Sequence, residues 1–278
     1  HAGRGQGGLH FGLLPFAVGF YEMQLERLEP DLAALTEQYM REAFPTVLGV
    51  RPSIHRVIPV EQAIPAGIEI LPYERASEIL DRAQSWGEMD CICRKQQKLV
   101  GKGCAAPAGL CMVMSDRPGA FDQAPDVRAL TREGAAQALR RAEDAGLVHS
   151  TSNTRSGIWY ICNCCTCCCG VLRGIAEFGI RESVAHSAFW ATVDEGLCTG
   201  CGACEERCRF GALQVEDGLC RVDQDRCAGC GLCAGVCPSG ALELQRRPAD
   251  QVQAVPPDMQ AWWAERARAR GLDLNRIL

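Results

Sequence analysis

Two cysteine-rich runs near the carboxyl end of the 278-residue chain have the spacing of metal ligands. Residues 198–213 read CTGCGACEERCRFGAL and residues 227–242 read CAGCGLCAGVCPSGAL, so both contain Cys-x2-Cys-x2-Cys-x3-Cys. Two-residue spacing lets a tight loop present three sulfurs to one side, and the glycines between the cysteines permit that curvature. A cubane iron–sulfur cluster needs four thiolates around one small volume. The two runs therefore predict two [4Fe-4S] clusters.

The spacing also predicts which cysteine binds which cluster, because the fourth cysteine of each run binds the other cluster. Cluster A has Cys198, Cys201, Cys204 and Cys237 as predicted ligands, and cluster B has Cys227, Cys230, Cys233 and Cys208. Crossed ligands hold the two clusters close together, which suits electron transfer between them. Structural zinc is the alternative, but zinc sites use four ligands per ion and rarely show this doubled spacing.

Residues 194–245 resemble the bacterial-type ferredoxins that carry two [4Fe-4S] clusters, and the resemblance implies a ferredoxin-like fold. One departure from that family is visible. The second run ends in Cys237-Pro238 as the family does, whereas the first ends in Cys208-Arg209. All eight sulfurs are present, so two clusters are still implied. Positive charge favours a reduced cluster, and we therefore expect Arg209 to raise the potential of one cluster.

Ten further cysteines precede these runs, and their spacing argues against a disulfide framework because adjacent cysteines make poor partners. They are Cys91, Cys93, Cys104 and Cys111, followed by Cys162, Cys164, Cys165, Cys167, Cys168 and Cys169. Tightly spaced thiols with no visible signal peptide are typical of metal ligands in a reducing compartment. We predict two further [4Fe-4S] clusters with two cysteines spare. One larger cluster, structural zinc and a noncubane catalytic cluster are the alternatives.

The dense string at residues 162–169 predicts how the upstream cysteines divide. In an extended conformation, Cys162, Cys164 and Cys168 point to one side of the strand. The other side then carries Cys165, Cys167 and Cys169, so that opposite faces serve two clusters. One cysteine, Cys220, is left over and is expected to be a small buried residue.

The upstream cysteines carry a second resemblance. Residues 91–95 and the string at 162–169 resemble a family of larger iron–sulfur proteins of anaerobes, in which a Cys-rich domain precedes a two-cluster ferredoxin. The resemblance covers roughly residues 10–270. It implies a redox subunit without naming a reaction, and it implies that an additional amino-terminal helical region is missing from this chain.

Composition and the remaining motifs restrict the function classes. The net charge of -5 and the pI near 5.6 do not favour nucleic acid or an anionic membrane as a partner. The longest apolar run, residues 9–21, is too short to span a bilayer. We find no phosphate loop, no dinucleotide fingerprint and no catalytic triad, so no catalytic residue is assigned and a small-molecule substrate is not expected.

The isolated histidines and a short basic run are expected to have structural roles or to face solvent. His55, His149 and His186 have no ligand-like spacing to one another, so structural roles are expected. A basic run extends from Arg94 to Lys102 and includes Lys95 and Lys98. It is expected to be a solvated face, with partner docking or cluster tuning as the alternative.

The pattern of the rest of the chain predicts an α+β fold. A helix is expected over residues 22–44, kinked or divided at Pro30, and a second over residues 131–145, capped by Thr131. A short hairpin follows the second helix and forms with it a winged-helix-like fragment. The proline-rich residues 45–72 are expected to be an extended surface connection. Asp258 is expected to cap a final helix.

The sequence pattern predicts that the chain is divided into four segments or domains. They are a helical and extended amino-terminal segment at 1–72, a Cys-rich iron–sulfur domain at 73–190, a two-[4Fe-4S] ferredoxin domain at 191–247, and a linker with a carboxyl-terminal helix at 248–278. The Cys-rich domain is expected to be α+β, and the ferredoxin domain ferredoxin-like.

The leading functional prediction is a multi-cluster electron-transfer subunit of a larger cytoplasmic redox complex. It relays single electrons through up to four [4Fe-4S] clusters between protein redox partners, with no nucleic-acid partner and no membrane span. This prediction favours a non-catalytic subunit over an enzyme. Two alternatives are a catalytic iron–sulfur reductase with a substrate-binding cluster in the 162–169 region, and a redox-sensing regulator that uses the winged-helix-like fragment.

Overall fold

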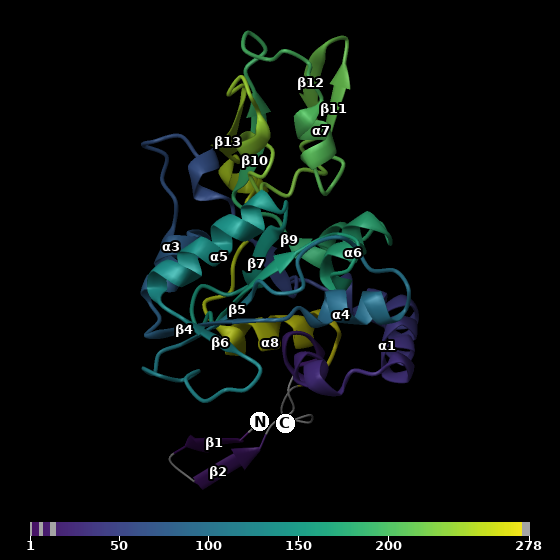
Figure 1. Ribbon diagram of the computed structural model, residues 1–278, viewed down its shortest axis with the longest axis vertical. Helices are drawn as coiled ribbons and strands as arrows, with labels where there is room; N and C mark the ends of the chain where they lie inside the picture. The colour runs from purple at the N-terminus through teal and green to yellow at the C-terminus, as the bar shows by residue number, and fades with distance from the viewer. Residues whose placement is uncertain (1, 6–7, 12–14, 274–278) are drawn as a thin grey trace.

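A seven-stranded sheet forms the centre of the computed structural model, which describes residues 2–5, 8–11 and 15–273 (Figure 1). In order across the sheet, the strands are β6 (Arg128–Leu130), β4 (Ser85–Met89), β5 (Cys111–Ser115), β8 (Tyr160–Cys164), β7 (Val148–Ser152), β3 (His55–Val57) and β9 (Val184–Ala185). All neighbours are antiparallel except β3 and β9. The chain is therefore an α+β protein, as predicted.

The two faces of this sheet carry different chemistry, because side chains alternate along each strand. Met112 and Met114 of β5 and Ile161 of β8 pack with helices α3 (Ala76–Asp81) and α5 (Arg132–Asp144) in one apolar core. The alternate positions, Cys111 and Cys162 among them, face the other way. One face thus stabilises the domain, and the other presents thiols.

The predicted helix and hairpin are confirmed. Thr131 precedes α5, and its Oγ1 accepts a hydrogen bond from the N–H of Gly134 at 3.0 Å. Gly146 follows the helix with φ of 69°. The hairpin is formed by β7 and β8, which occupy central positions in the sheet. Its strands are therefore enclosed by β5 and β3 on either side.

The prediction of a surface connection at residues 45–72 is wrong for its middle part. Residues 53–60 are buried, and β3 within them pairs with both β7 and β9. Pro52 and Pro59 lie just outside this three-residue strand, so they limit its length without removing a donor from the ladder. The apolar side chains of Val57 and Ile58 are buried, and each packs in a different apolar core of the body.

Proline divides the amino-terminal helical region, as predicted. A 3-10 helix over Glu22–Arg27 ends before α1 (Pro30–Glu42), in which Pro30 is the first residue, and α2 (Phe44–Leu48) follows. The remaining helices are α4 (Ile92–Leu99), α6 (Gly170–Ala176), α7 (Ala203–Arg207) and α8 (Met259–Ala269). Strand β1 (Ala2–Gly5) pairs antiparallel with β2 (Gly8–Phe11) in a separate sheet. Residues 12–14, within the apolar run noted above, lie outside the described residues.

The final helix is capped as predicted, since Oδ1 of Asp258 accepts from the N–H of Ala261 at 2.8 Å. Trp262 of this helix is buried, and its Nε1 donates to the carbonyl of Ser53 at 2.9 Å. The helix therefore closes the body beside β3. No helix in the described part of the chain has the length and apolarity needed to cross a membrane.

A buried ion pair holds α1 against α6. Nη1 and Nη2 of Arg173 contact the two carboxylate oxygens of Glu37 at 2.8 and 2.9 Å, and both residues are buried. We expect Arg173→Met to lower the free energy of unfolding by about 1.5–3 kcal/mol, because Glu37 loses its bidentate charged partner but keeps the contacts with Arg41 at 2.8 Å and Gln97 at 2.6 Å. Anaerobic denaturant titration measures this. Arg51→Met, which breaks an exposed pair with Glu182, should cost under about 1 kcal/mol, and equal losses would contradict the expectation.

A carboxyl-terminal module, residues 189–246, lies at one end of the body (Figure 1). It contains two antiparallel pairs, β10 (Phe189–Val193) with β13 (Leu242–Arg246) and β11 (Leu213–Glu216) with β12 (Leu219–Val222). Short loops and α7 connect them. All eight cysteines of the two paired runs lie in this module.

The departure at Arg209 has a structural explanation. Its Nε donates to the carbonyl of Gly146 at 2.9 Å, and Arg207 donates to the carbonyls of Glu143 and Asp144. These carbonyls lie at the end of α5, where cations are stabilised by the helix dipole. Arg209 and Arg207 therefore join the module to the Cys-rich body.

We expect the double variant Arg207→Gln, Arg209→Gln to loosen this contact. Charge-assisted hydrogen bonds are worth roughly 1.5–3 kcal/mol each, so amide exchange in the last turn of α5 should speed up by about tenfold or more. Hydrogen exchange with mass spectrometry measures this. Arg226→Gln is the control, because Arg226 donates to Phe210 within the module. Unchanged exchange in the double variant would show that the contact does not hold the module.

Candidate iron–sulfur and thiolate sites

The cysteines predicted for cluster A line a single cavity of the module. Its wall includes Cys198, Cys201, Cys204 and Cys237, together with Cys220. The backbone N–H of Cys220 donates to Sγ of Cys198 at 3.4 Å. Cys201 is exposed, so this cavity lies at the outer surface of the module. Four converging thiols of this kind fit a [4Fe-4S] cluster.

The cysteines predicted for cluster B line a second cavity, with Cys208, Cys227, Cys230 and Cys233 in its wall. Backbone N–H groups of Ala212 and Ala191 donate to Sγ of Cys208 at 3.2 Å and Cys227 at 3.4 Å. Burial raises the pKa of Cys230 to about 12. A buried thiol with this pKa keeps its proton at neutral pH unless a metal replaces it, so the donor set fits a bound cluster.

The loop around cluster B, residues 227–231, is hydrogen-bonded to the body of the protein. The N–H of Val60 donates to the carbonyl of Cys230 at 2.9 Å. Ser187, next to β9, donates from its N–H to Ala228 at 3.0 Å and from its Oγ to Gly229 at 2.7 Å. The thiols predicted for cluster B therefore lie at the junction between module and body, whereas exposed Cys201 of the cluster A set lies at the surface of the module.

Six of the ten upstream cysteines line one buried cavity, here called the six-cysteine chamber. They are Cys91, Cys93, Cys111, Cys162, Cys164 and Cys169. Pairing of β5 with β8 brings Cys111 beside Cys162, and alternation along β8 places Cys164 on the same face. Cys91 and Cys169 immediately precede α4 and α6. Contacts with Cys111 and Cys93, and the backbone N–H of Arg94 in the first turn of α4, lower the pKa of Cys91, whereas contact with Cys164 raises the pKa of Cys169.

Polar groups without partners also face the chamber. His55 and Tyr21 line it and are each 3% exposed. Neither His55 Nε2 nor the Tyr21 hydroxyl has a hydrogen-bond partner among the described residues. Glu22 lines the same cavity, and burial raises its pKa to about 7. Buried polar atoms without partners are rare in native proteins, so these two fit a chamber that holds a further group.

His55 is the residue that sequence reasoning missed. It lies 36 residues before Cys91, in a segment expected to be on the surface. Only the pairing of β3 with β7 brings it to the thiols, where Ser150 Oγ lies 3.4 Å from His55 Nδ1 and 3.9 Å from Cys164 Sγ. No spacing signal in the sequence links these residues.

Arg94 is buried and lies between the two groups of upstream cysteines, which corrects the expectation of a solvated basic face. Its guanidinium donates to the carbonyls of Asn163 at 2.9 Å and Gly109 at 2.8 Å. The thiols of Cys91 and Cys164 lie close enough to interact with its charge. Lys98 of the same helix is exposed. The basic run therefore contains one cation that compensates thiolate charge and others that do not.

The other four upstream cysteines form a second group, here called the four-cysteine site: Cys104, Cys165, Cys167 and Cys168. Their sulfur atoms all lie within 4.8 Å of one another. The expected division of the string is wrong at Cys168 and Cys169, which exchange groups. Strand β8 ends at Cys164 and a turn follows, so alternation no longer decides the direction of the later side chains.

The remaining predicted positions have ordinary structural surroundings. Cys220 is buried, as expected, with its Sγ 3.5 Å from that of Cys204. Both ring nitrogens of His149 are occupied, by Asn163 at 2.5 Å and Glu143 at 3.2 Å. Burial lowers the pKa of His186 to about 4, so that it is neutral at pH 7. His149 and His186 thus take structural roles.

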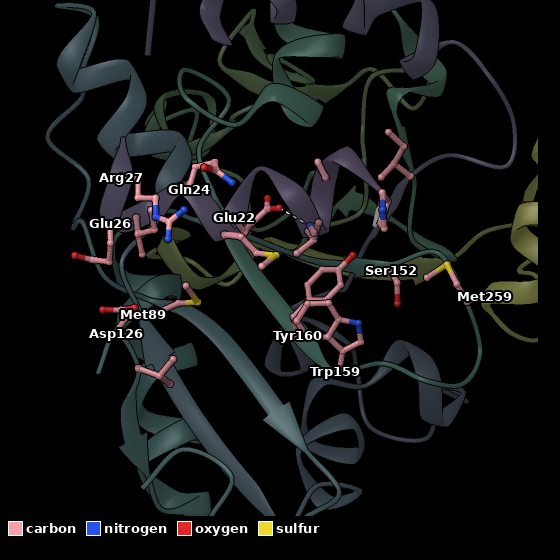
Figure 2. A pocket seen from close by; sticks show the side chains of 18 of the residues that line it. Glu22, Gln24, Glu26, Arg27, Met89, Asp126, Ser152, Trp159, Tyr160 and Met259 are labelled. Atoms are coloured by element: carbon pink, nitrogen blue, oxygen red, sulfur yellow. Dashed lines mark hydrogen bonds between the residues drawn. The ribbon is translucent and has the colours of Figure 1, made fainter. Parts of the chain in front are cut away.

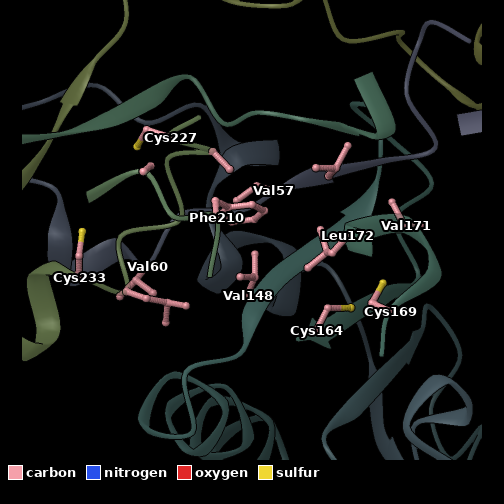
Figure 3. Packing of buried hydrophobic residues seen from close by; sticks show 14 of the residues in the cluster. Val57, Val60, Val148, Cys164, Cys169, Val171, Leu172, Phe210, Cys227 and Cys233 are labelled. Atoms are coloured by element: carbon pink, nitrogen blue, oxygen red, sulfur yellow. The ribbon is translucent and has the colours of Figure 1, made fainter. Parts of the chain in front are cut away.

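An apolar core connects the thiols predicted for cluster B with the six-cysteine chamber (Figure 3). Cys227 and Cys233 lie at one side of this core, and Cys164 and Cys169 lie at the other. The side chains between them include Phe210, Val148 of β7 and Leu172 of α6. The two thiol sites therefore share one continuous buried medium.

An open cleft of about 980 Å³ adjoins the chamber (Figure 2). The two cavities share Glu22, Met89, Trp159 and Tyr160 in their walls. Trp262 and Trp263 of α8 line the cleft on the far side. The cleft is large enough for a small organic molecule.

Comparison with known proteins gives a match only within the carboxyl-terminal module. The family model described as 4Fe-4S binding domain matches residues 191–214 and, separately, residues 221–243. Residues 191–243 are a 4Fe-4S ferredoxin-type segment. No curated protein matches the chain, and no solved structure matches it. The ferredoxin-type segment and the upstream thiols together indicate iron–sulfur chemistry and electron transfer.

Proposed function

We propose that this chain is an electron-transfer subunit of a larger cytoplasmic redox complex, acting between protein redox partners. Bound [4Fe-4S] clusters supply one-electron chemistry. We assign the two crossed ligand sets to clusters A and B, and a third cluster to the six-cysteine chamber. Four of the six chamber thiols are enough for a cubane, which leaves two of the six spare.

The observation that carries this proposal is the single buried core between cluster B and the chamber. Packed side chains keep the two sites in fixed positions and exclude water from the space between them. Cys201 is exposed, which supports cluster A as the outer end of the path, where a partner protein has access. The order cluster A, cluster B, chamber therefore runs from the surface inward.

Iron and sulfide counting of the anaerobically purified chain tests the proposal. We expect about twelve iron atoms per chain, four for each cluster, with signals from all three in EPR of the reduced protein. About eight would contradict a cluster in the chamber. The triple variant Cys111→Ser, Cys162→Ser, Cys164→Ser leaves only three chamber thiols and should lower the iron content by about four, whereas Cys220→Ser should leave it unchanged. Loss of iron from both variants would contradict the ligand assignment.

Membership of a complex needs its own test. We expect native purification of the endogenous chain to yield a stoichiometric partner that carries its own redox centre. Elution of the chain by itself under gentle, anaerobic conditions would contradict a complex. Mild salt should release the partner if charged surfaces guide the association.

A second candidate, a catalytic iron–sulfur reductase, is favoured by the cleft beside the chamber. A cluster with an open coordination position in the chamber would face molecules that enter between Trp159 and Trp262. Cyanide is a suitable probe, because it binds open iron positions. A change in the EPR signal of the chamber cluster on adding cyanide would support catalysis, and an unchanged signal would contradict it.

A further inference from the structure

Among the described residues, the sulfur atoms of the four-cysteine site lie closer together than those of the other thiol sites. Sγ of Cys104 lies 3.8 Å from that of Cys165 and 3.6 Å from that of Cys168. Sγ of Cys167 lies 3.8 Å from that of Cys168. An ion bound tetrahedrally by four sulfurs at about 2.3 Å places neighbouring sulfurs roughly 3.8 Å apart. These three separations therefore match those around a single tetrahedral ion, and the other sulfur pairs of the site lie within 4.8 Å.

The ferredoxin-type segment supplies an internal reference for this comparison. Its eight cysteines have cubane spacing, and each thiolate of a cubane binds its own iron, so their sulfurs stand further apart than around one ion. Within the described residues, the four-cysteine site is the only group of three or more His, Cys, Asp or Glu ligands that is this compact. A second upstream cubane, expected from the sequence, does not fit this spacing.

We propose that the four-cysteine site is a structural zinc site, separate from the iron–sulfur clusters. Four thiolates complete a tetrahedral zinc site, which leaves no open position for substrate. Soft thiolate ligands in this geometry select zinc or iron, and zinc binds more tightly than ferrous iron in the general order of divalent metals. The site therefore needs no redox role to explain its ligands.

The position of the site explains what the ion stabilises. Cys104 lies in an irregular loop between α4 and β5, and the other three ligands lie in the turn between β8 and α6. Few regular hydrogen bonds hold that loop, so a bound ion would tie it to the turn. Buried Arg94, whose charge interacts with Cys165, offsets part of the negative charge of four thiolates.

The zinc site also positions the chamber. Cys164 and Cys165 are adjacent, and so are Cys168 and Cys169, yet each pair is divided between the two sites. An ion that fixes Cys165 and Cys168 therefore orients the backbone that presents Cys164 and Cys169 to the chamber. Two neighbouring thiol sites thus share one turn without sharing a ligand.

Metal analysis of the full chain, purified anaerobically from cells grown with both iron and zinc, tests this proposal. We expect about one zinc atom per chain, independent of how much iron is present. Cys104→Ser should reduce zinc at least fivefold, because this exposed ligand is contributed by a different segment from the others. Thr166→Ala, within the same turn but without a ligand atom, should keep its zinc. A wild-type chain without zinc, or a Cys104 variant that retains it, would overturn the proposal.

X-ray absorption at the zinc edge of the unmodified protein gives a second measurement that does not depend on a variant folding. We expect four sulfur neighbours at about 2.3 Å and no nitrogen or oxygen neighbour. Zinc with mixed ligands would show adventitious binding elsewhere and would overturn the assignment. Cys111→Ser, in the chamber, should leave the zinc spectrum unchanged, so that failure of the chamber cluster is distinguishable from failure of the zinc site.

Discussion

Replacing Arg94 with glutamine is expected to lower the midpoint potential of a cluster in the six-cysteine chamber by on the order of 100 mV. The guanidinium is buried beside chamber thiols, and a positive charge stabilises the reduced form. A unit charge roughly 6 Å away in a medium of effective dielectric about 20 contributes about 3 kcal/mol. For one electron, about 1.4 kcal/mol corresponds to 59 mV, so this interaction is worth on the order of 100 mV.

A redox titration monitored by EPR measures this shift in midpoint potential. Another cation of the same helix provides a matched control. Lys98 is exposed and Lys98→Gln removes an equal charge from α4, where solvent screens its effect. We expect the Lys98 variant to stay within about 20 mV of the wild type. Glutamine at position 94 can still donate to the carbonyl of Gly109 or Asn163, which limits the structural cost. Equal potentials for the Arg94 variant and the wild type would show that its charge does not reach the cluster.

Replacing Gly229 with alanine is expected to remove cluster B and to destabilise the module by about 2–5 kcal/mol. Gly229 has φ of 69°, a conformation that costs a non-glycine residue about 1–2 kcal/mol. A Cβ at this position would lie 2.0 Å from the carbonyl oxygen of Phe189 and 2.2 Å from Oγ of Ser187. The loop must therefore move away from the body, taking Cys227 and Cys230 with it.

Two other glycines of the module serve as controls that distinguish the effect of the positive φ from the effect of the steric clash. Gly202 has φ of 80° but open space around a Cβ, so Gly202→Ala should cost only the conformational strain. Gly235 has open space and no such φ, so Gly235→Ala should be close to neutral. Iron content and denaturant midpoints, compared across the three variants, measure the effect. A Gly229 variant that keeps its iron and resembles the Gly202 variant would mean that the close approach to Phe189 is unimportant.

The substitutions at Arg94 and Gly229 should affect the proposed iron–sulfur sites and leave the proposed zinc site intact. The two classes of thiol site can therefore be distinguished by experiment. Arg94 lies between the chamber and the four-cysteine site, so its substitution alters a potential without removing a ligand. Gly229 lies at the junction of module and body, so its substitution removes the cluster that connects the two. Zinc content should be unchanged in the Gly229 variant, because the four-cysteine site lies in the body.

Local sequence was sufficient for the features whose partners lie close together in the chain. The cap at Thr131, the hairpin after α5 and the cap at Asp258 depend on interactions over a few residues, and all three are found as predicted. The crossed ligand sets follow from repeated short spacing, and the same eight cysteines line the two cavities of the module.

Only tertiary structure decided how the ten upstream cysteines divide. Cys104 and Cys111 are seven residues apart, yet a loop takes one to the four-cysteine site and β5 takes the other to the chamber. The turn after Cys164 reverses the alternation that an extended string would follow. His55 reaches the chamber only because β3 pairs inside the sheet. The sequence by itself determined the ligand types and the paired runs, since thiolate chemistry and short loops are local. The grouping of distant ligands depends on strand pairing and burial, which involve residues far apart in the chain.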